Sequence, residues 1–564
     1  MGRQKEIYNF LFSIILAFLF EEIKSDNENK NSDKSYEIIL YFQSNGLQSL
    51  YCDDNIQFFR TKNINFYKIE KELRTKSIGG IEFNIPYYVM KLINSSSIIS
   101  TSSNFCKSLI KCNITSINNE IIIELKDHPK TLKRLFSGSS IYKIQRFEYP
   151  FPLDESDYNE MFYQCTELIY VNFYFFSFEN ATDVSGMFNY CKKLETIIFP
   201  ENSTSSNVEN FMEMFAHAES LTSIDLIYFS FVKAKSMAYM FNGCKNLEYI
   251  NFPQNEKAEN LQFLNGMLGD CLNLISVDLS TFSFKNVENM EYMFHGCNRL
   301  STIIFPRESG ISTALQNAKY MFYDCKELTS INLSEISFLN VKDLSYMFYG
   351  CYNLETLILP SYEELNNEID FYNKIEQMSY AFYNCSKLKS IDLYKFNINL
   401  VTNLEYLFYS CSSLETIKLP KNKINNVESF FHAFDNCSKL KNIDLTNISF
   451  LKAKNIGFMF VNCSALLEIK FDHKEKVKNI NNMNGTFANC TSIISIDISH
   501  IYINNNAILD SLFLNCFALR EINLFNIDTT KSISIFNFLN NDNLENCSYY
   551  SLDNIHLNIV YILI

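Results

Sequence analysis

One pattern of twenty residues recurs through most of the chain and constrains its fold more than any other feature. Its clearest copy is VENMEYMFHGCNRLSTIIFP at residues 287–306. The apolar residues from Val287 to Cys297 follow spacings of three, three, one and three, which predicts one face of a short helix. Ile303 and Phe305 then alternate with outward positions in a short strand, which Pro306 ends. Because one helix and one strand cannot bury their faces alone, the unit requires copies of itself alongside.

The copies align on the position of Cys297. Phe stands three residues before this position in thirteen of the fourteen units, and Leu stands three residues after it in thirteen. Composition alone does not produce such agreement. The fourteen aligned positions are Cys165, Cys191, Ala218, Cys244, Cys271, Cys297, Cys325, Cys351, Cys385, Cys411, Cys437, Cys463, Cys490 and Cys516.

The units alternate between two types. One type ends in a strand stopped by Pro, as at Pro306, and the other carries Asp at the outward strand position, as at Asp278. The step from the Asp type to the Pro type is always 26 residues, whereas the reverse step varies from 26 to 34. The true period is therefore a pair, and insertions follow the Pro-type strand. The largest, residues 361–377, is predicted to be a binding loop, because solenoid insertions collect on one face. Its acidic residues are Glu363, Glu364, Glu368 and Asp370.

We therefore predict an α/β solenoid over residues 135–546, a right-handed leucine-rich-repeat-like array of short helices and parallel strands with degenerate end units. Phe294, Cys297, Leu300 and Ile303 are assigned structural roles within the repeat. The repeat cysteines admit two interpretations, disulfides between neighbouring units or buried thiols that fill a small apolar slot. Ala218 fills the same slot without a thiol, which favours the second.

The segments outside the array carry no repeat. Residues 1–25 resemble a secretory signal, since Arg3 and Lys5 precede a short apolar run. Residues 26–34 form a polar linker, and residues 35–134 are predicted to be a small β-rich capping domain with strands near 36–42, 64–69 and 121–125. Residues 547–564 read as a C-terminal cap or tail, with a lipid-anchor signal as the alternative. Pairing among Cys52, Cys106, Cys112 and Cys547 cannot be read from the sequence.

Composition and motifs bound the function. The net charge of −14 argues against nucleic acid as a partner. No nucleophile elbow, phosphate loop or metalloprotease motif occurs, and no paired Cys motif suggests zinc, so we expect no catalysis, cofactor or metal. The acidic column is either a binding strip on the exposed sheet face or a solvated strand face. Its members are Asp225, Asp278, Asp392, Asp444 and Asp497.

The unit resembles the repeats of BspA-like leucine-rich repeat surface proteins, as Met293-Phe294, Cys297, Leu300, Ile303 and Phe305 illustrate. The resemblance covers residues 135–546. It implies a solenoid on a secreted or cell-surface protein linked to adhesion, which leads us to expect a non-catalytic module for protein or glycan ligands on the sheet face or the insertion loop, with no spanning membrane segment. An intracellular interaction scaffold is the main alternative, and a hydrolase with an unrecognised site is the other.

Overall fold

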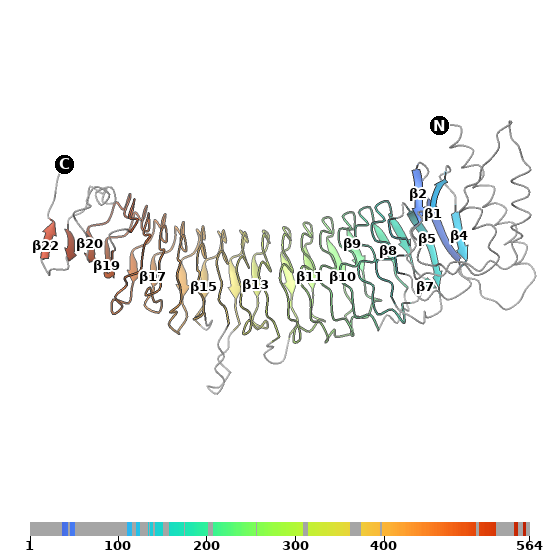
Figure 1. Cartoon of the computed structure of the whole chain (residues 1–564), viewed down its shortest axis with the longest axis horizontal. Helices are drawn as coiled ribbons and strands as arrows, with labels where there is room; N and C mark the ends of the chain where they lie inside the picture. Colours follow the sequence, from blue (N-terminus) through green and yellow to red (C-terminus); the bar gives the residue numbers. More distant parts are fainter. Residues whose placement is uncertain are drawn as a thin grey trace, which may run out of the picture. The chain divides into compact units, whose positions relative to one another are not determined.

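The structure is a computed structural model with two compact units, Met1–Ala258 and Glu259–Ile564. We describe each unit by itself (Figure 1). The segments expected to be a signal, residues 1–25, and a linker, residues 26–34, lie outside the described residues, as do Cys52, Cys106 and the whole acidic set at positions 363–370. The described residues are 37–42, 46–50, 110–114, 120–124, 133–134, 136–138, 141–149, 157–173, 175–176, 178–200, 207–254, 256–307, 314–360, 374–394, 398–503, 507–525, 546–550 and 556–559.

The first unit joins an antiparallel sheet to parallel rungs. β1 pairs antiparallel with β4 and β5, and β5 then pairs parallel with β6, which pairs with β8. The strands expected near 36–42 and 121–125 are present as β1 and β4, while 64–69 lies outside the described residues. The strands are β1 (Glu37–Phe42), β2 (Gly46–Leu50), β3 (Ile110–Ile114), β4 (Glu120–Glu124), β5 (Ile141–Tyr149), β6 (Tyr170–Asn172), β7 (Phe175–Phe176), β8 (Thr196–Ile198), β9 (Ser223–Asp225) and β10 (Tyr249–Asn251).

The second unit is a parallel-strand solenoid in which the strands from β11 to β18 pair two by two, and β19 to β22 form a four-stranded sheet with β22 antiparallel to β21. An Asp- or Asn-ended strand pairs in register with the following Pro-type strand, so that Val277 lies beside Ile303. This confirms the period of two repeats. The strands are β11 (Ser276–Asp278), β12 (Thr302–Ile304), β13 (Ser330–Asn332), β14 (Thr356–Ile358), β15 (Ser390–Asp392), β16 (Thr416–Lys418), β17 (Asn442–Asp444), β18 (Glu468–Lys470), β19 (Ser495–Tyr502), β20 (Glu521–Phe525), β21 (Asn546–Tyr550) and β22 (His556–Ile559).

The short helix predicted in each repeat is wrong, because no helix occurs among the residues that the structure describes. Tyr292 and Gly296 have φ of 57° and 71°, and this left-handed conformation interrupts a helix every fourth residue. Successive four-residue turns replace it, as when the Cys297 N–H donates to the Phe294 carbonyl at 3.1 Å. The alternate N–H groups point to the next rung. The Phe294 N–H, for example, donates to the Met321 carbonyl at 2.9 Å. Such turns also place every third or fourth side chain inward.

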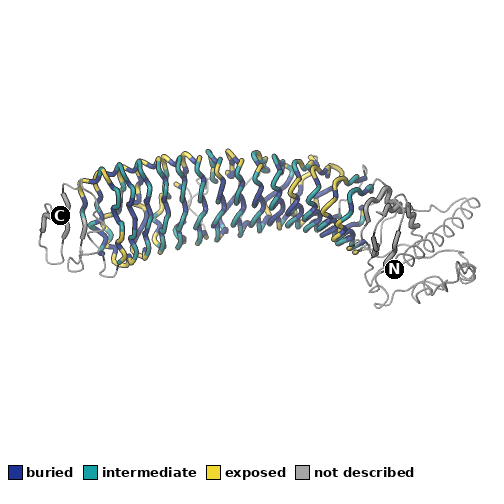
Figure 2. Tube along the Cα trace, turned by 90° about the horizontal axis from the view of Figure 1, so that it is seen from above, coloured by how far each residue is buried: buried dark blue, intermediate teal, exposed yellow. Residues whose placement is uncertain are grey.

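The core contains a column of stacked phenylalanines that runs from rung to rung beside a column of thiols. Figure 2 shows buried segments along each rung. Phe294 and Phe322 are fully buried, with ring centroids 5.3 Å apart. Cys297 and Leu300 have no exposed surface, while Ile303 is half-buried. The thirteen repeat cysteines are free thiols, so they form no rung-to-rung disulfides. Each unit therefore buries the same set of side chains against its neighbours.

The slot of the repeat cysteine is more than an apolar space. The Cys297 thiol donates to the backbone carbonyl of Leu268 on the preceding rung, 3.1 Å away. The Cys325 thiol likewise donates to Phe294, whose carbonyl also accepts the Cys297 N–H. Burial raises the pKa of the Cys244 thiol to about 12. The thiols are consequently protonated donors at neutral pH, and the bond adds to the size requirement that the sequence suggested.

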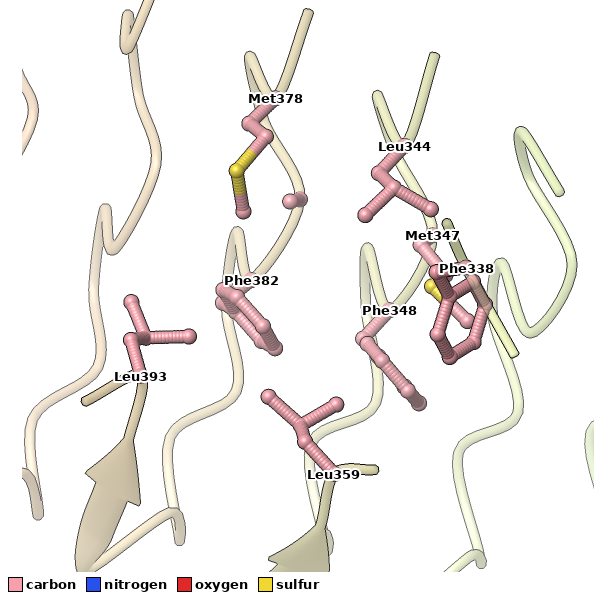
Figure 3. Close-up of a pocket in the computed structure, with 9 residues that line it drawn as sticks. Phe338, Leu344, Met347, Phe348, Leu359, Met378, Phe382 and Leu393 are labelled. Atoms are coloured by element: carbon pink, nitrogen blue, oxygen red, sulfur yellow. The ribbon is translucent and has the colours of Figure 1, made fainter. Parts of the chain in front are cut away.

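A small apolar cavity interrupts the core of the second unit (Figure 3). It measures about 10 Å³ and has no polar group on its wall that could hold a water molecule. Ala381 borders it at the position that Met347 fills one rung earlier, so the missing side-chain atoms explain the space. The lining residues are Phe338, Leu344, Met347, Phe348, Leu359, Met378, Ala381, Phe382 and Leu393.

Candidate binding surface

Two columns of aromatic side chains run along one side of the second unit, five and two residues before the repeat cysteine. Neighbouring rings stack at centroid distances of 4.5 to 4.9 Å within each column. We call both columns together the aromatic strip. The first column contains Tyr292, Tyr320, Tyr346, Tyr380, Tyr406, His432 and Phe458, and the second contains His295, Tyr323, Tyr349, Tyr383 and Tyr409.

The turns that replace the helix also bring the two columns together. Tyr346 has a φ of 60°, and its carbonyl accepts the N–H of Tyr349 at 3.2 Å to close a turn. The two rings consequently lie 5.9 Å apart. The N–H of Tyr346 donates to Ser379 on the next rung, which fixes the rung spacing. A bulky residue with positive φ is uncommon, and such strain concentrates at functional sites, which motivates a search for function here.

An outer ladder of Asx turns supports the strip. Asn317, Asp343, Gln377 and Asn403 form successive parallel bridges three residues before the first column. The side-chain oxygen of Asp343 accepts the N–H of Ser345 at 2.8 Å, which turns the chain toward Tyr346. Short polar side chains favour such turns because they hydrogen-bond the backbone two residues on. The polar residues of this ladder thus help to place the aromatic rings.

Stacking decides which parts of the rings a ligand can meet. Tyr349 and Tyr383 are nearly parallel, with an interplanar angle of 5° and centroids 4.5 Å apart. Each interior ring therefore has both faces covered by its neighbours, and its edge and hydroxyl are what it can offer. The tyrosine rings are half-buried, so they lose little side-chain entropy when a partner covers them. The strip is a preorganised surface of ring edges and phenol groups.

The phenol groups are free to bind. In the part of the chain that the structure describes, no protein group hydrogen-bonds to the hydroxyls of eight strip tyrosines, and none of these oxygens is buried. Burial raises the pKa of Tyr380 and of Tyr383 to about 12. Both hydroxyls are therefore protonated donors throughout the physiological range. The eight are Tyr320, Tyr323, Tyr346, Tyr349, Tyr380, Tyr383, Tyr406 and Tyr409.

The flanks of the strip are small and mildly acidic. The residues that precede the first column or follow the second include Ser345, Ser379, Gly350, Asn384 and Ser410. Carboxylates interact with the rings, and those of Glu405, Asp343, Asp324 and Asp435 each contribute to the raised pKa of at least one tyrosine. The Lys319 ammonium lies 3.1 Å from the Asp343 carboxylate and offsets its negative charge. The surroundings thus combine short hydrogen-bonding side chains with a negative local field.

The predicted acidic column is exposed or half-buried at the strand ends, and it has a local structural partner. In every member one carboxylate oxygen accepts the N–H two residues on, at 2.9 to 3.1 Å. The members are Asp225, Asp278, Asp392, Asp444 and Asp497. Lysines stand between some of them, and the Lys418 ammonium lies 2.9 Å from Asp392. Hydrogen bonds from Thr446 hold the pKa of Asp444 below its usual value, and Lys470 adds to the effect. A ligand role for this column stays a prediction.

A second polar cluster lies near the end of the second unit. The Lys423 ammonium lies 2.6 Å from Asp472 and 2.7 Å from Glu475, which braces rungs that are 49 residues apart in sequence. His500 is only 6% exposed, and its Nδ1 has no hydrogen-bond partner. Burial lowers the pKa of His500 to about 4. No three His, Cys, Asp or Glu side chains within the described ranges could hold a metal ion together.

Sequence reasoning missed the aromatic strip. The signal was present as YMFYD, YMFYG, YAFYN and YLFYS, beginning at Tyr320, Tyr346, Tyr380 and Tyr406. Interpretation as a helix placed the two tyrosines of each segment on one face, as i,i+3 neighbours, but gave no reason for them to meet across units. A second signal, the excess of Gly, Asn and Asp directly before the repeat cysteine, indicates the positive φ found there.

Comparisons with known proteins agree on the repeat. The family described as "Mycoplasma protein of unknown function, DUF285" matches residues 156–263, 262–362 and 358–473, and the family described as "BspA type Leucine rich repeat region (6 copies)" matches residues 433–559. No curated protein matches the sequence. Within the described ranges, no helix is long and apolar enough to cross a membrane.

Several solved structures are similar at low identity. A leucine rich cell surface protein from Faecalibacterium prausnitzii is 17% identical, with 72% of this chain and 90% of that chain covered and a TM-score of 0.29. An internalin from Listeria monocytogenes is 15% identical, with 58% and 88% covered and a TM-score of 0.22. The pneumococcal vaccine antigen PcpA is 14% identical, with 72% and 82% covered and a TM-score of 0.27.

Proposed function

Because the chain belongs to the family described as "Mycoplasma protein of unknown function, DUF285" and carries BspA-type leucine-rich repeats, we propose that it is a secreted or cell-surface module that binds protein ligands without catalysis. The signal-like residues 1–25 support export. The aromatic strip supports the binding role, and it is the observation on which the proposal depends.

The chemistry of the strip is that of a protein-recognition surface. Tyrosine supplies a large and rigid contact area at low entropic cost, while Ser, Gly and Asn supply adaptable hydrogen bonds, as in antibody paratopes. The segments from Ser345 to Gly350 and from Ser379 to Asn384 have this composition. Tyrosine is also enriched at the energetic centres of protein interfaces. A sugar ring, by contrast, packs on an open aromatic face, and the faces of the interior rings are covered by their neighbours.

Site-specific cross-linking tests the binding role. A photo-reactive phenylalanine analogue replaces Tyr349 in the strip or, as the control, Tyr249 on the sheet face, which is 52% exposed. Both proteins are displayed on intact cells or mixed with extracellular proteins and then irradiated. We expect discrete adducts from position 349 that Tyr383→Ala abolishes and that position 249 does not give. Identical adducts from both positions, or none from position 349, would refute the role of the strip.

Localisation tests the other half of the proposal. A C-terminal fluorescent fusion is combined with N-terminal sequencing of the mature protein. We expect export and loss of residues 1–25. If the fusion stays in the cytosol with those residues intact, the protein is instead an intracellular interaction scaffold.

A further inference from the structure

The rings of the strip offer an ordered array of phenol hydrogen-bond donors, while the carboxylate acceptors lie on its flanks. The free phenol groups of Tyr346, Tyr349, Tyr380 and Tyr383 are protonated, and the edge of an aromatic ring carries partial positive charge. Both features favour carbonyl oxygens on the ligand. A polyproline II segment has such oxygens in abundance, because it makes no internal hydrogen bonds and its carbonyls all face outward. This argument rests on the proposed function, since it concerns the ligand of the same surface.

The spacing of the rungs selects among extended ligands. Ring-to-ring steps between Tyr292 and His432 measure 4.5 to 4.8 Å, so that two steps come to about 9.3 Å. One turn of polyproline II is three residues of about 3.1 Å each, which gives about the same length. A β-strand repeats its side chains about every 6.7 Å and falls out of step with the rungs. A polyproline II segment along the strip stays in register across the whole column.

The charges around the strip favour a basic ligand. The carboxylates that interact with the strip tyrosines are those of Asp324, Asp343, Glu405 and Asp435, against the ammonium group of Lys319. The chain as a whole carries −14. Basic side chains on the ligand would therefore lie along the flanks, while its backbone lies on the tyrosine edges.

We propose that the aromatic strip binds a basic, proline-rich protein segment in the polyproline II conformation, with every third ligand residue in the same position on every second rung. The prolines bring the segment to the surface with its conformation already formed, which lowers the entropic cost of binding. Arginine at the third position reaches the flanking carboxylates.

Peptide titration against the full chain tests this inference. The probe is Pro-Pro-Arg repeated to about twelve residues, which spans about four double rungs. Two matched peptides separate conformation from charge: Gly-Ser-Arg repeats keep the charge without the conformation, and Pro-Pro-Glu repeats keep the conformation with the opposite charge. Binding is measured by calorimetry at low and at physiological salt. We expect saturable micromolar binding of the first peptide, at least about tenfold weaker binding of the second, and none of the third.

The protein variants place the binding on the strip. Tyr349→Phe with Tyr383→Phe removes two hydroxyls and keeps the stacked rings, so we expect about tenfold weaker binding with unchanged far-ultraviolet circular dichroism. Tyr249→Phe on the sheet face is the matched control and should leave affinity unchanged. Equal binding of the Pro-Pro-Arg and Gly-Ser-Arg peptides, or equal binding by both variants, would overturn the inference. Strip-dependent cross-links without peptide binding would overturn it and leave the proposed function standing.

Discussion

Replacement of a repeat cysteine separates two explanations of the thiol column. Cys297 is fully buried, and its thiol lies 3.1 Å from the Leu268 carbonyl. If the slot needs only a small apolar group, Ala should be tolerated better than Ser, because a buried hydroxyl without a partner costs about 1–3 kcal/mol. If the thiol is a hydrogen-bond donor, Ser keeps the bond and Ala loses it. Thiol-to-carbonyl distances are 2.9 to 3.2 Å, and the serine C–O bond is about 0.4 Å shorter than the cysteine C–S bond, so a shift of a few tenths of an ångström keeps the hydroxyl within bonding range.

The expected magnitudes follow from the two contributions. Loss of one buried heavy atom costs about 1 kcal/mol, and loss of a hydrogen bond costs about 0.5–1.5 kcal/mol. Cys297→Ala should therefore destabilise the protein by about 2 kcal/mol, and Cys297→Ser by about 1 kcal/mol. The reverse experiment uses the one unit without a cysteine: in Ala218→Cys the new thiol would reach the Phe188 carbonyl, with a gain of about 1 kcal/mol.

The assay is guanidinium unfolding of the full chain under reducing conditions, followed by circular dichroism. Repeat arrays can unfold in parts, so hydrogen exchange of peptides around residue 297 provides a local measure of the same effect. The unmodified protein and Ala218→Cys are compared side by side. A Ser variant that is at least about 1 kcal/mol less stable than the Ala variant would refute the hydrogen-bond explanation.

Three further predictions follow from single residues. His500 has a pKa lowered from about 6.5 to about 4 by burial. Its contribution to stability is therefore fully present above pH 6.5 and is lost as the pH falls toward 4, by about 3 kcal/mol. His500→Phe should flatten this slope in melting experiments. In Gly296→Ala the new Cβ meets the Asp270 side chain and the backbone has a positive φ, so the free energy of unfolding should fall by about 2–3 kcal/mol. Gly138 has a φ of +69° and nothing near its Cβ position, so Gly138→Ala should lower it by only about 1 kcal/mol, as denaturant unfolding can measure. Spectrophotometric titration at 295 nm should show two phenols that ionise near pH 12, and Tyr380→Phe with Tyr383→Phe should remove them; ionisation of both near pH 10 would contradict their burial.

The sequence predicted the array because its periodicity reports burial directly. The positions of Phe294, Cys297 and Leu300 point inward in every unit. Side chains that face a core must repeat with the rung. Alternation of Asp278-type and Pro306-type strands likewise predicted the pairing of strands, since a change of outward residue every second rung reveals a period of two. Wherever a position is defined by burial, the pattern of apolar residues was sufficient.

The helix was predicted wrongly because inward spacing does not determine backbone conformation. A run of four-residue turns with Tyr292 and Gly296 in the left-handed region places the same residues inward as a helix does. The two conformations differ in where the N–H groups point, within the segment or to the next rung. Apolar spacing carries no information on that choice, whereas the Gly and Asn residues before the cysteine do.

The candidate site was hidden for the same reason. In a helix, Tyr346 and Tyr349 would have no regular neighbours in the next unit, because rungs built on helices stand about 10 Å apart. With turns in place of helices the rungs approach to the strand spacing, and rings of successive units stack at 4.5 to 4.7 Å. The close spacing that removes the helix is therefore what creates the strip. A ligand surface of this kind is a property of the array, since no single unit can cover the faces of its own rings.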